Sequence, residues 1–390
     1  MLKDKRKHKD NIVLIIADCL RNDHAYDPKI MPFLNSFKDK NRFSNKSYTN
    51  APSTHFAMPT LMTGYMPFEV TDKATINFQN ENRYIPKLYK QLGYRTIGVT
   101  TNIVTSRAFG YMKYYDTYED FWTDANSINE SRKDIVRLLP HSIRQRVVDP
   151  ILKKAGSLIR PPTKVKEAIS GKRILNALTN LPFKQKIGNF IFLHFMEPHS
   201  PYTSDEGIIP KKEINKLNLK LITKKHKLTK DDIKKLKKLY TLECKQLDKI
   251  LKKTIHFLKE NLDWNKTKIL ITSDHGEAFN ETGYMEHSSI MIDNMHHIKV
   301  PLITKEFPIN NSSQYWSVDL YNLLCPRPTK KTPTYKIAVC YDSVKKIGKN
   351  VIKKYEPIGF FNLKFFTKVS STEELPYMKS SKSLIENLSI

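Results

Sequence analysis

The sequence is poor in the features that mark small crosslinked, collagen-like and membrane-spanning proteins. Its four cysteines, at positions 19, 244, 325 and 340, show no C-x-x-C spacing, which argues against a dense disulfide scaffold or a zinc knuckle. The 12 glycines and 21 prolines follow no fixed period, so collagen-like and low-complexity structures are excluded. No run approaches the ~18–20 apolar residues that a membrane span requires.

Acidic residues are scarce relative to basic ones. The chain has 39 Asp and Glu against 66 Lys and Arg, a net charge of +27. Such an excess is typical of proteins that bind nucleic acid, a phospholipid surface or an acidic polysaccharide, but a lysine-rich solvated surface gives the same count. Nucleic acid is the least favoured partner, because no zinc-finger or RNP-like pattern accompanies the basic residues.

The N-terminus imitates a signal peptide. Basic residues 3–9 precede an apolar run at 11–17, but Asp18, Arg21 and Asp23 follow without a small-residue cleavage site. We therefore predict that Ile12–Ile16 is a buried parallel strand. The expected location is the cytoplasm, with peripheral contact at the inner face of an anionic membrane as a further expectation.

Strand-like runs alternate with helical stretches along the chain, and 390 residues suffice for one large domain with an appendage. The alternation predicts an α/β fold with a largely parallel sheet. The predicted strands are Ile12–Ala17, Thr96–Thr100, Phe190–His194, Lys268–Thr272 and Lys299–Thr304, and the predicted helices are Met31–Lys38, Ile85–Leu92 and Asp231–Glu260.

Polar residues follow several of these strands. In α/β sheets ligands bind beyond the carboxyl ends of the strands. Any one of these residues can be a helix N-cap, but together they offer carboxylate and imidazole ligands suited to a divalent cation such as zinc or manganese. They are Asp18, Asn102, His194, His199, Asp274, His275 and Glu277.

Composition suggests three further regions. Residues 132–186 are basic and are punctuated by prolines, among them Pro140, Pro150, Pro161 and Pro162, which predicts an insertion or lid over the sheet edge. The Lys-rich region 211–260 carries apolar residues at helical spacing, which predicts a core-packed helix with a solvated lysine face; contact with an anionic surface is the alternative. Residues 327–390 are predicted to form a small C-terminal subdomain with strands at Lys336–Cys340 and Phe360–Val369, after a main domain at 10–326.

Several motifs carry a family resemblance. NIVLIIADCLRNDH at 11–24 resembles the opening strand and first metal ligand of the sulfatase branch of the alkaline phosphatase superfamily, and ILITSDHGE at 269–277 resembles its second ligand block. LHFMEPHSPY at 193–202 is similar to its substrate-facing loop, and LGYRTIGVTTN at 92–102, IKVPLI at 298–303 and SVDLYNLL at 317–324 complete the series. The resemblance implies an alkaline-phosphatase-like three-layer sandwich with a mostly parallel central sheet.

The nucleophile segment distinguishes the branches of this superfamily. Sulfatases carry C-x-P-S-R there, whereas this chain reads STHFAMPTLMT at 53–63, which makes formylglycine chemistry unexpected. A Thr with a downstream Pro, here Thr54 and Pro59, is similar to phosphoethanolamine and phosphoglycerol transferases. The resemblance implies metal ligation by Asp18, Thr54, Asp274 and His275. Calcium is less expected, since Cys19 replaces the second Asp of sulfatases.

The function implied is phosphoryl-group transfer or hydrolysis with Thr54 as nucleophile, acting on a phosphate- or sulfate-bearing substrate with a cell-surface glycan or glycolipid as acceptor. The transferases of this branch generally carry transmembrane helices before the catalytic domain, and this chain shows none. The alternatives are a sulfate or phosphate ester hydrolase, or a catalytically silent module that binds anions or membrane. The substrate-binding candidates are His199, His287, His194 and Asn102.

Some residues keep a second interpretation. Thr54 or Ser53 can be a helix N-cap, and His287 can be a surface histidine. Glu277 can either orient the metal-binding His or cap a turn. Cys19 is predicted to be a small packed residue rather than a reactive thiol.

Overall fold

The computed structural model describes residues 9–67, 71–72, 75–76, 81–121, 170–181, 183, 187–204, 206–223, 227–281, 285–287, 295–326, 337–343, 355–362 and 367–369. A seven-stranded sheet forms its centre, in the order β2-β10-β9-β1-β8-β6-β7. Its strands are β1 (Asn11–Ala17), β2 (Arg42–Ser44), β6 (Arg95–Thr100), β7 (Thr117–Asp120), β8 (Asn189–Phe195), β9 (Thr267–Thr272) and β10 (Leu302–Lys305).

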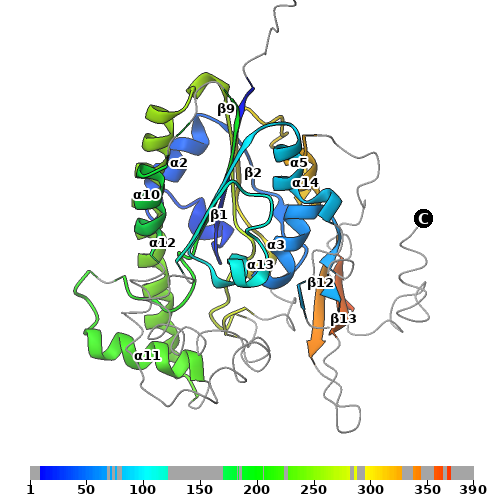
Figure 1. Cartoon of the computed structure of the whole chain (residues 1–390). Helices are drawn as coiled ribbons and strands as arrows, with labels where there is room; N and C mark the ends of the chain where they lie inside the picture. Colours follow the sequence, from blue (N-terminus) through cyan, green and yellow to red (C-terminus); the bar gives the residue numbers. More distant parts are fainter. Residues whose placement is uncertain are drawn as a thin grey trace, which may run out of the picture.

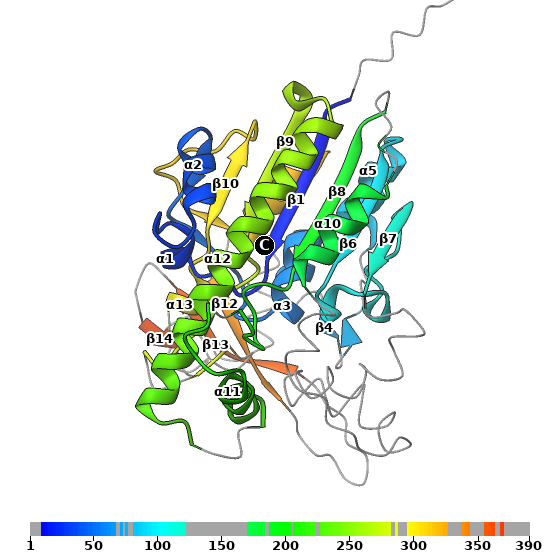
Figure 2. The same ribbon diagram turned by 90° about the vertical axis from the view of Figure 1, so that its left-hand side faces the viewer.

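Strands β9, β1, β8, β6 and β7 are parallel, so their carboxyl ends meet at one edge. Figure 2 shows these strands side by side behind α12 and α10. The register pairs Ile16 of β1 with His194 of β8 and Thr272 of β9. The residues after these strands are consequently neighbours in space.

Each face of the sheet has its own hydrophobic core. Strand β1 is buried along its whole length; Val13 and Ile15 belong to one core and Leu14 and Ile16 to the other, since successive side chains of a strand point to opposite faces. Figure 1 shows helices on both sides of the sheet. On one side lie α2 (Pro32–Asp39), α10 (Gly171–Thr179) and α12 (Lys230–Asn261), and on the other α3 (Thr54–Thr63), α5 (Ile85–Gln91) and α14 (Ser317–Leu324).

The remaining elements are short or lie at the periphery. They are α1 (Asn22–Ala25), β3 (Ser47–Tyr48), β4 (Thr71–Asp72), β5 (Thr75–Ile76), η1 (Glu81–Arg83), η2 (Ile103–Thr105), η3 (Arg107–Phe109), α11 (Lys211–Thr223), η5 (Trp264–Lys266), α13 (Met295–Ile298), β11 (Tyr315–Trp316), β12 (Ile337–Ser343), β13 (Tyr355–Asn362) and β14 (Thr367–Val369). Among the helices of the described residues, none combines the length and apolar character that crossing a membrane requires.

Helix α12 confirms the long helix predicted at 231–260. A capping box begins it, in which the Thr229 hydroxyl accepts from the Asp232 N–H and the Asp232 carboxylate accepts from the Thr229 N–H. Its apolar residues are buried in the core on one side of the sheet. Tyr240 extends from the helix to the end of β1, where its hydroxyl donates to the Cys19 carbonyl at 2.8 Å.

Two predicted strands differ from the structure. The strand expected at 299–304 begins only at Leu302 and runs antiparallel to β9, because Val300 and Pro301 belong to the turn after α13 and proline cannot donate to a sheet ladder. The strand expected at 360–369 is two strands, the end of β13 and β14, in a three-stranded antiparallel sheet with β12.

The predicted insertion at 132–186 is only partly described. Residues 132–169 lie outside the described residues. Helix α10 contacts α12, β6 and β8, so this portion belongs to the helical layer over the sheet face.

Candidate active site

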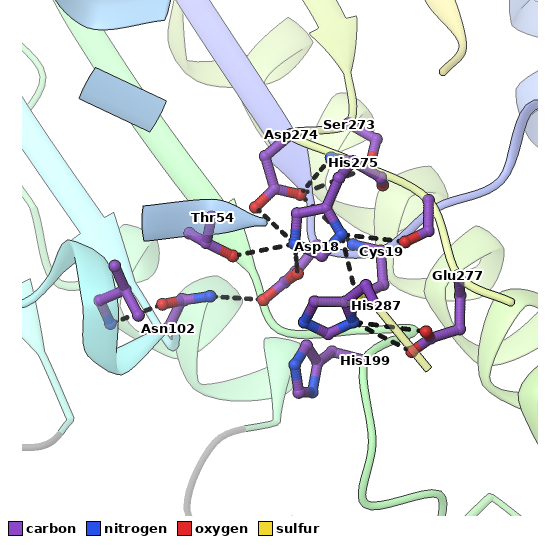
Figure 3. Close-up of polar contacts among 12 residues, drawn as sticks. Asp18, Cys19, Thr54, Asn102, His199, Ser273, Asp274, His275, Glu277 and His287 are labelled. Atoms are coloured by element: carbon purple, nitrogen blue, oxygen red, sulfur yellow. Dashed lines mark hydrogen bonds and ion pairs between the residues drawn. The ribbon is translucent and has the colours of Figure 1, made fainter. Parts of the chain in front are cut away.

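The residues predicted after the parallel strands converge at the carboxyl edge of the sheet. Asp18 follows β1, Asn102 follows β6 after one residue, His194 is the penultimate residue of β8, and Asp274 follows β9 after one residue. Figure 3 shows Asp18, Asn102 and Asp274 around one point, together with Thr54 and His275. The topology therefore assembles a single site from five separate segments.

Asp18 and Asp274 face His275 with one oxygen each. Asp18 Oδ1 and Asp274 Oδ2 both lie 3.6 Å from His275 Nε2. Both oxygens are buried, and neither has a hydrogen-bond partner among the described residues. Burial and then repulsion from Asp274 raise the pKa of Asp18. Burial opposes ionisation of Asp274, but attraction to His275 and His194 outweighs it and lowers its pKa. The two carboxylates repel each other, and a bound cation would relieve this repulsion.

The tautomer of His275 follows from its partner. Nδ1 lies 2.9 Å from the carbonyl oxygen of Gly276, and since a carbonyl only accepts, Nδ1 carries the proton and Nε2 keeps its lone pair. Gly276 itself is required, because a Cβ there would lie 1.8 Å from the His296 carbonyl oxygen. The loop thus presents a ligand-competent nitrogen to the two carboxylates.

Thr54 is the first residue of α3, and its hydroxyl lies 3.2 Å from His275 Nε2. Ser53 occupies the N-cap position, so the N-cap interpretation of Thr54 is wrong: its hydroxyl contacts His275 instead. The N-terminus of this ten-residue helix carries partial positive charge and favours an anion. Gly64 ends the helix at φ +66°, a left-handed C-cap conformation that suits glycine.

His194, near the end of β8, lies beside the Asp274 carboxylate. Its Nδ1 contacts the Thr105 hydroxyl at 3.0 Å. Its Nε2 is buried 4.0 Å from Asp274 Oδ2 and has no hydrogen-bond partner in the part of the chain that the structure describes. Burial, and secondarily His275, lower the pKa of His194 to about 4, so the ring is neutral near pH 7. A neutral imidazole anchored through one nitrogen is typical of a metal ligand.

Asn102 contacts Asp18 directly. Its Nδ2 donates to Asp18 Oδ2, and its Oδ1 accepts from the Val104 N–H at 2.6 Å. Both ends of the amide are therefore engaged within the protein, and the side chain fixes the orientation of the Asp18 carboxylate.

His199 and His287 lie together on the other side of the site, with ring centroids 5.0 Å apart. His199 Nδ1 donates to the Ser200 carbonyl, and burial followed by His287 lowers its pKa to about 3. The side chain of His287 is 9% exposed and contacts both carboxylate oxygens of Glu277, at 3.3 and 3.4 Å. The surface interpretation of His287 is therefore wrong, and Glu277 holds His287 rather than His275.

Cys19 was not among the predicted site residues, but its thiol lies inside the site. Sγ is 3.4 Å from His287 Nδ1 and 3.6 Å from His275 Nδ1. The backbone has φ +62°, a conformation that costs energy for a non-glycine residue and recurs at functional sites. Burial raises the pKa of the thiol, which agrees with the prediction of a small packed residue rather than a reactive thiol.

The donor set fits a divalent cation. Asp18 Oδ1, Asp274 Oδ2 and His194 Nε2 are buried and have no hydrogen-bond partner within the described ranges. Asp18, Asp274 and His275 offer ligand atoms within 4.8 Å of one another. The hydroxyl oxygen of Thr54, next to His275 Nε2, adds a further ligand atom to those of Asp18, Asp274 and His275. Cys19, His275 and His287 also converge, but the nitrogen that His275 turns toward Cys19 is protonated, so this group is a poorer fit.

Arg21 is a structural residue that sequence reasoning did not assign. It is 1% exposed, and its guanidinium contacts Asp23 and Glu281 at 2.6 Å each and the Glu277 carbonyl at 3.3 Å. It thereby ties the segment after β1 to the loop that carries Glu277. The sequence around Arg21 gives no sign that its partner is Glu281, 260 residues further along the chain.

The architecture and the site define an α/β protein with a candidate metal centre at the carboxyl edge of its sheet. The family model described as Sulfatase matches residues 10–309. The chain belongs to the sulfatase family. No curated protein matches it.

Solved structures share the fold at low sequence identity. A phosphonate monoester hydrolase from Silicibacter pomeroyi superposes with a TM-score of 0.61 at 14% identity, covering 97% of this chain and 94% of that one. A Bacteroides thetaiotaomicron protein described in the context of the metabolism of multiple glycosaminoglycans gives 0.55 at 15%, with coverages of 90% and 84%. The lipooligosaccharide phosphoethanolamine transferase EptA from Neisseria meningitidis gives 0.50 at 15%, with coverages of 82% and 55%. These likenesses support the three-layer fold predicted from the motifs.

Proposed function

We propose that this protein is a metal-dependent phosphoryl-group transferase or hydrolase in which Thr54 is the nucleophile. The observation that carries the proposal is the position of the Thr54 hydroxyl, 3.2 Å from His275 Nε2, where two unpartnered carboxylate oxygens also converge. Residues 53–63 contain no cysteine, so a formylglycine nucleophile is not available and the threonine takes that place.

A threonine hydroxyl is a weak nucleophile near neutral pH because it is protonated. A divalent cation held by Asp18, Asp274, His275 and Thr54 would lower the pKa of this hydroxyl. Thr54 Oγ then forms a bond to phosphorus in line with the leaving oxygen, whose bond to phosphorus breaks. The leaving group departs as an alcohol with the released proton. Water or an acceptor hydroxyl resolves the phosphothreonine, and the bond between Thr54 Oγ and phosphorus breaks.

The transferred group carries negative charge on its non-bridging oxygens, and hydrogen-bond donors or partial positive charge beside them stabilise it. The N-terminus of α3 lies beside the nucleophile. His199 and His287 are anchored through Nδ1, so Nε2 of each ring donates to a phosphoryl oxygen only when the ring carries a second proton, a form that a bound anion favours. The neutral His194 remains beside the carboxylates.

For the substrate class, we propose an anionic glycan or glycolipid that receives or loses a phosphodiester-linked group, as in phosphoethanolamine or phosphoglycerol transfer. The resemblance of the segment with Thr54 and Pro59 supports this assignment, together with the net charge of +27, which attracts acidic polymers.

The experiment is turnover of aryl phosphomonoester, phosphodiester and sulfate probes by the wild type, Thr54→Ser and Thr54→Ala. We expect phosphodiester turnover to dominate and Thr54→Ala to lose at least about 10³-fold, with bound metal retained in Thr54→Ser. Intact-mass analysis of the quenched reaction should show a phosphoryl adduct on the protein, and peptide mass spectrometry should locate it on the peptide that contains Thr54. Added glycerol raises the transfer product if the enzyme is a transferase. Full activity of Thr54→Ala would overturn the proposal.

A further inference from the structure

A large cavity lies on the helical side of the sheet, away from the catalytic residues. It measures about 1240 Å³ and is lined by residues of α2, α10, α12, η5 and the end of β10. This exceeds the ~300–1,000 Å³ of ordinary small-molecule pockets. Figure 2 shows α12 and α10 side by side on this face, with α2 beyond α12.

Lysine dominates the lining. Of its 18 residues seven are lysines and one is acidic, Glu306, whereas the whole chain has 66 basic and 39 acidic residues. The enrichment therefore exceeds the general excess of the sequence. We call this cavity the lysine pocket and base the argument on six of the lysines: Lys40, Lys172, Lys249, Lys252, Lys253 and Lys259.

Among the described residues, the protein balances the positive charge of the lysine pocket only in part, through the attraction of Asp248 to Lys252 one turn further along α12. Among the described residues, none of these six lysines forms an ion pair. Glu306 pairs with Lys305 at 3.8 Å, and the nearby Asp248 carboxylate accepts the N–H groups of Phe33 and Leu34. A polyanion would therefore gain attraction without first displacing protein carboxylates.

The lysines on α12 share one face of the helix. Lys249, Lys252 and Lys253 are spaced i, i+3 and i+4, so their side chains are neighbours and repel one another. From Lys249 to Lys259 the helix rises about 15 Å, which gives a linear array of positive charge.

Aromatic and apolar side chains complete the lining. Phe33, Phe37 and Trp264 line the lysine pocket; Phe37 is buried and Trp264 is half-buried. Lys305 Nζ lies over the Trp264 ring, 4.9 Å from its centroid, which fixes the indole. A lining of aromatic surface and cationic groups suits a chain of rings that carry acidic substituents.

The lysine pocket is separate from the catalytic site. Tyr240 of α12 contacts the backbone at Cys19, and Lys249 lies nine residues further along the helix, about 14 Å along its axis. A molecule in the lysine pocket therefore does not occupy the position of the scissile ester.

We propose that the lysine pocket is a second binding site that holds a strand of an anionic glycan, bearing sulfate or phosphate groups. Its concave form and aromatic lining favour a chain over a flat bilayer. The choice of a glycan over another polyanion rests on the proposed function, because the enzyme would then retain the polymer whose esters it processes.

The test is equilibrium binding of dextran sulfate oligosaccharides and of neutral dextran of equal length. The pocket variant is Lys249→Gln/Lys252→Gln/Lys253→Gln. The matched control is Lys29→Gln/Lys46→Gln/Lys211→Gln, which removes the same charge at exposed positions elsewhere. We expect the pocket variant to weaken dextran sulfate binding at least about tenfold and the control to change it little, with neutral dextran bound by neither.

Several results would overturn the proposal. Equal losses in the two variants would mean that diffuse charge, and not the lysine pocket, binds the polymer. Tighter binding of phosphatidylglycerol vesicles or single-stranded DNA through the same lysines would mean that the lysine pocket binds a membrane or a nucleic acid and not a glycan.

Aryl phosphodiester turnover should be equal in both variants. If the wild type turns over no ester, the proposed function fails, whereas loss of dextran sulfate binding in the pocket variant alone still supports the binding site.

Discussion

The Thr54 hydroxyl and His275 Nε2 lie 3.2 Å apart although 221 residues separate them in the chain. Thr54 begins a helix on one side of the sheet, and His275 follows a central strand. Their proximity follows from the parallel strands that end at the same edge. The predictions below concern this site and the contacts that hold it.

Metal removal should destabilise the protein. Binding to the folded state alone adds about 2.7 kcal/mol of unfolding free energy at a free-metal concentration 100 times Kd. Chelation should therefore lower Tm, and added zinc or manganese should restore it. Asp18→Asn is the matched variant: its metal-free form should be more stable than the metal-free wild type, since burial and repulsion from Asp274 disfavour the Asp18 carboxylate, and zinc should no longer raise its Tm. An unchanged zinc response would exclude Asp18 as a ligand.

Asn102 should act through Asp18. Loss of its amide donor should weaken metal affinity about 10–100-fold, the usual effect of a residue that orients a ligand. Asn102→Asp separates this role from capping, because an aspartate still accepts from the Val104 N–H but cannot donate to Asp18 when ionised. Competition with a chromophoric chelator gives the affinity. If Asn102→Asp binds metal as well as the wild type, the amide serves only as a cap.

The Cys19 thiol should react slowly in the folded protein. Burial, and then the charge of Asp18, raise its pKa, and only the thiolate is nucleophilic. Iodoacetamide labelling followed by peptide mass spectrometry should find the peptide with Cys19 unmodified in the native state and fully labelled in urea. Rapid native labelling of that peptide would show an exposed or ionised thiol.

Glu281 should stabilise the fold in a pH-dependent way. Burial raises its pKa, but hydrogen bonds from Arg21 and the Phe279 N–H outweigh this and lower it from 4.5 to about 2. Because the folded-state pKa is depressed, the contribution is complete above pH 4.5 and is lost as the pH falls toward 2. Glu281→Gln should cost about 1–2 kcal/mol near neutral pH and show a smaller loss across that window in urea unfolding. Parallel pH curves for both proteins would refute the coupling.

Asp248 should stabilise the start of α2. It projects from α12 and accepts the N–H groups of Phe33 and Leu34 at 3.0 and 2.8 Å, while the N-cap residue Met31 makes no side-chain cap. Asp248→Ala should lower the unfolding free energy by about 0.5–2 kcal/mol. Asp248→Asn should lose less, since one carbonyl oxygen still accepts. Equal stability of all three proteins in urea would show that the contact adds nothing.

The sequence alone determined the local parts of this protein. Short continuous apolar runs rich in β-branched residues, such as Ile12–Ile16, are typical of buried parallel strands, and polar residues directly after such strands lie at the ligand-binding edge of the sheet. Asp18, Asp274 and His275 were therefore predictable from their neighbours in the chain. Helix α12 was also predictable from the sequence, because apolar residues at helical spacing specify which face of a helix is buried.

Only the tertiary structure decided which partners these residues meet. The amide of Asn102 is bound to Asp18, Glu277 holds His287, and Arg21 joins Asp23 to Glu281. Strand β10 runs antiparallel to β9. Contacts of this kind depend on how strands and loops distant in the chain approach one another, and hydrophobic periodicity carries no information about polar partners far along the chain.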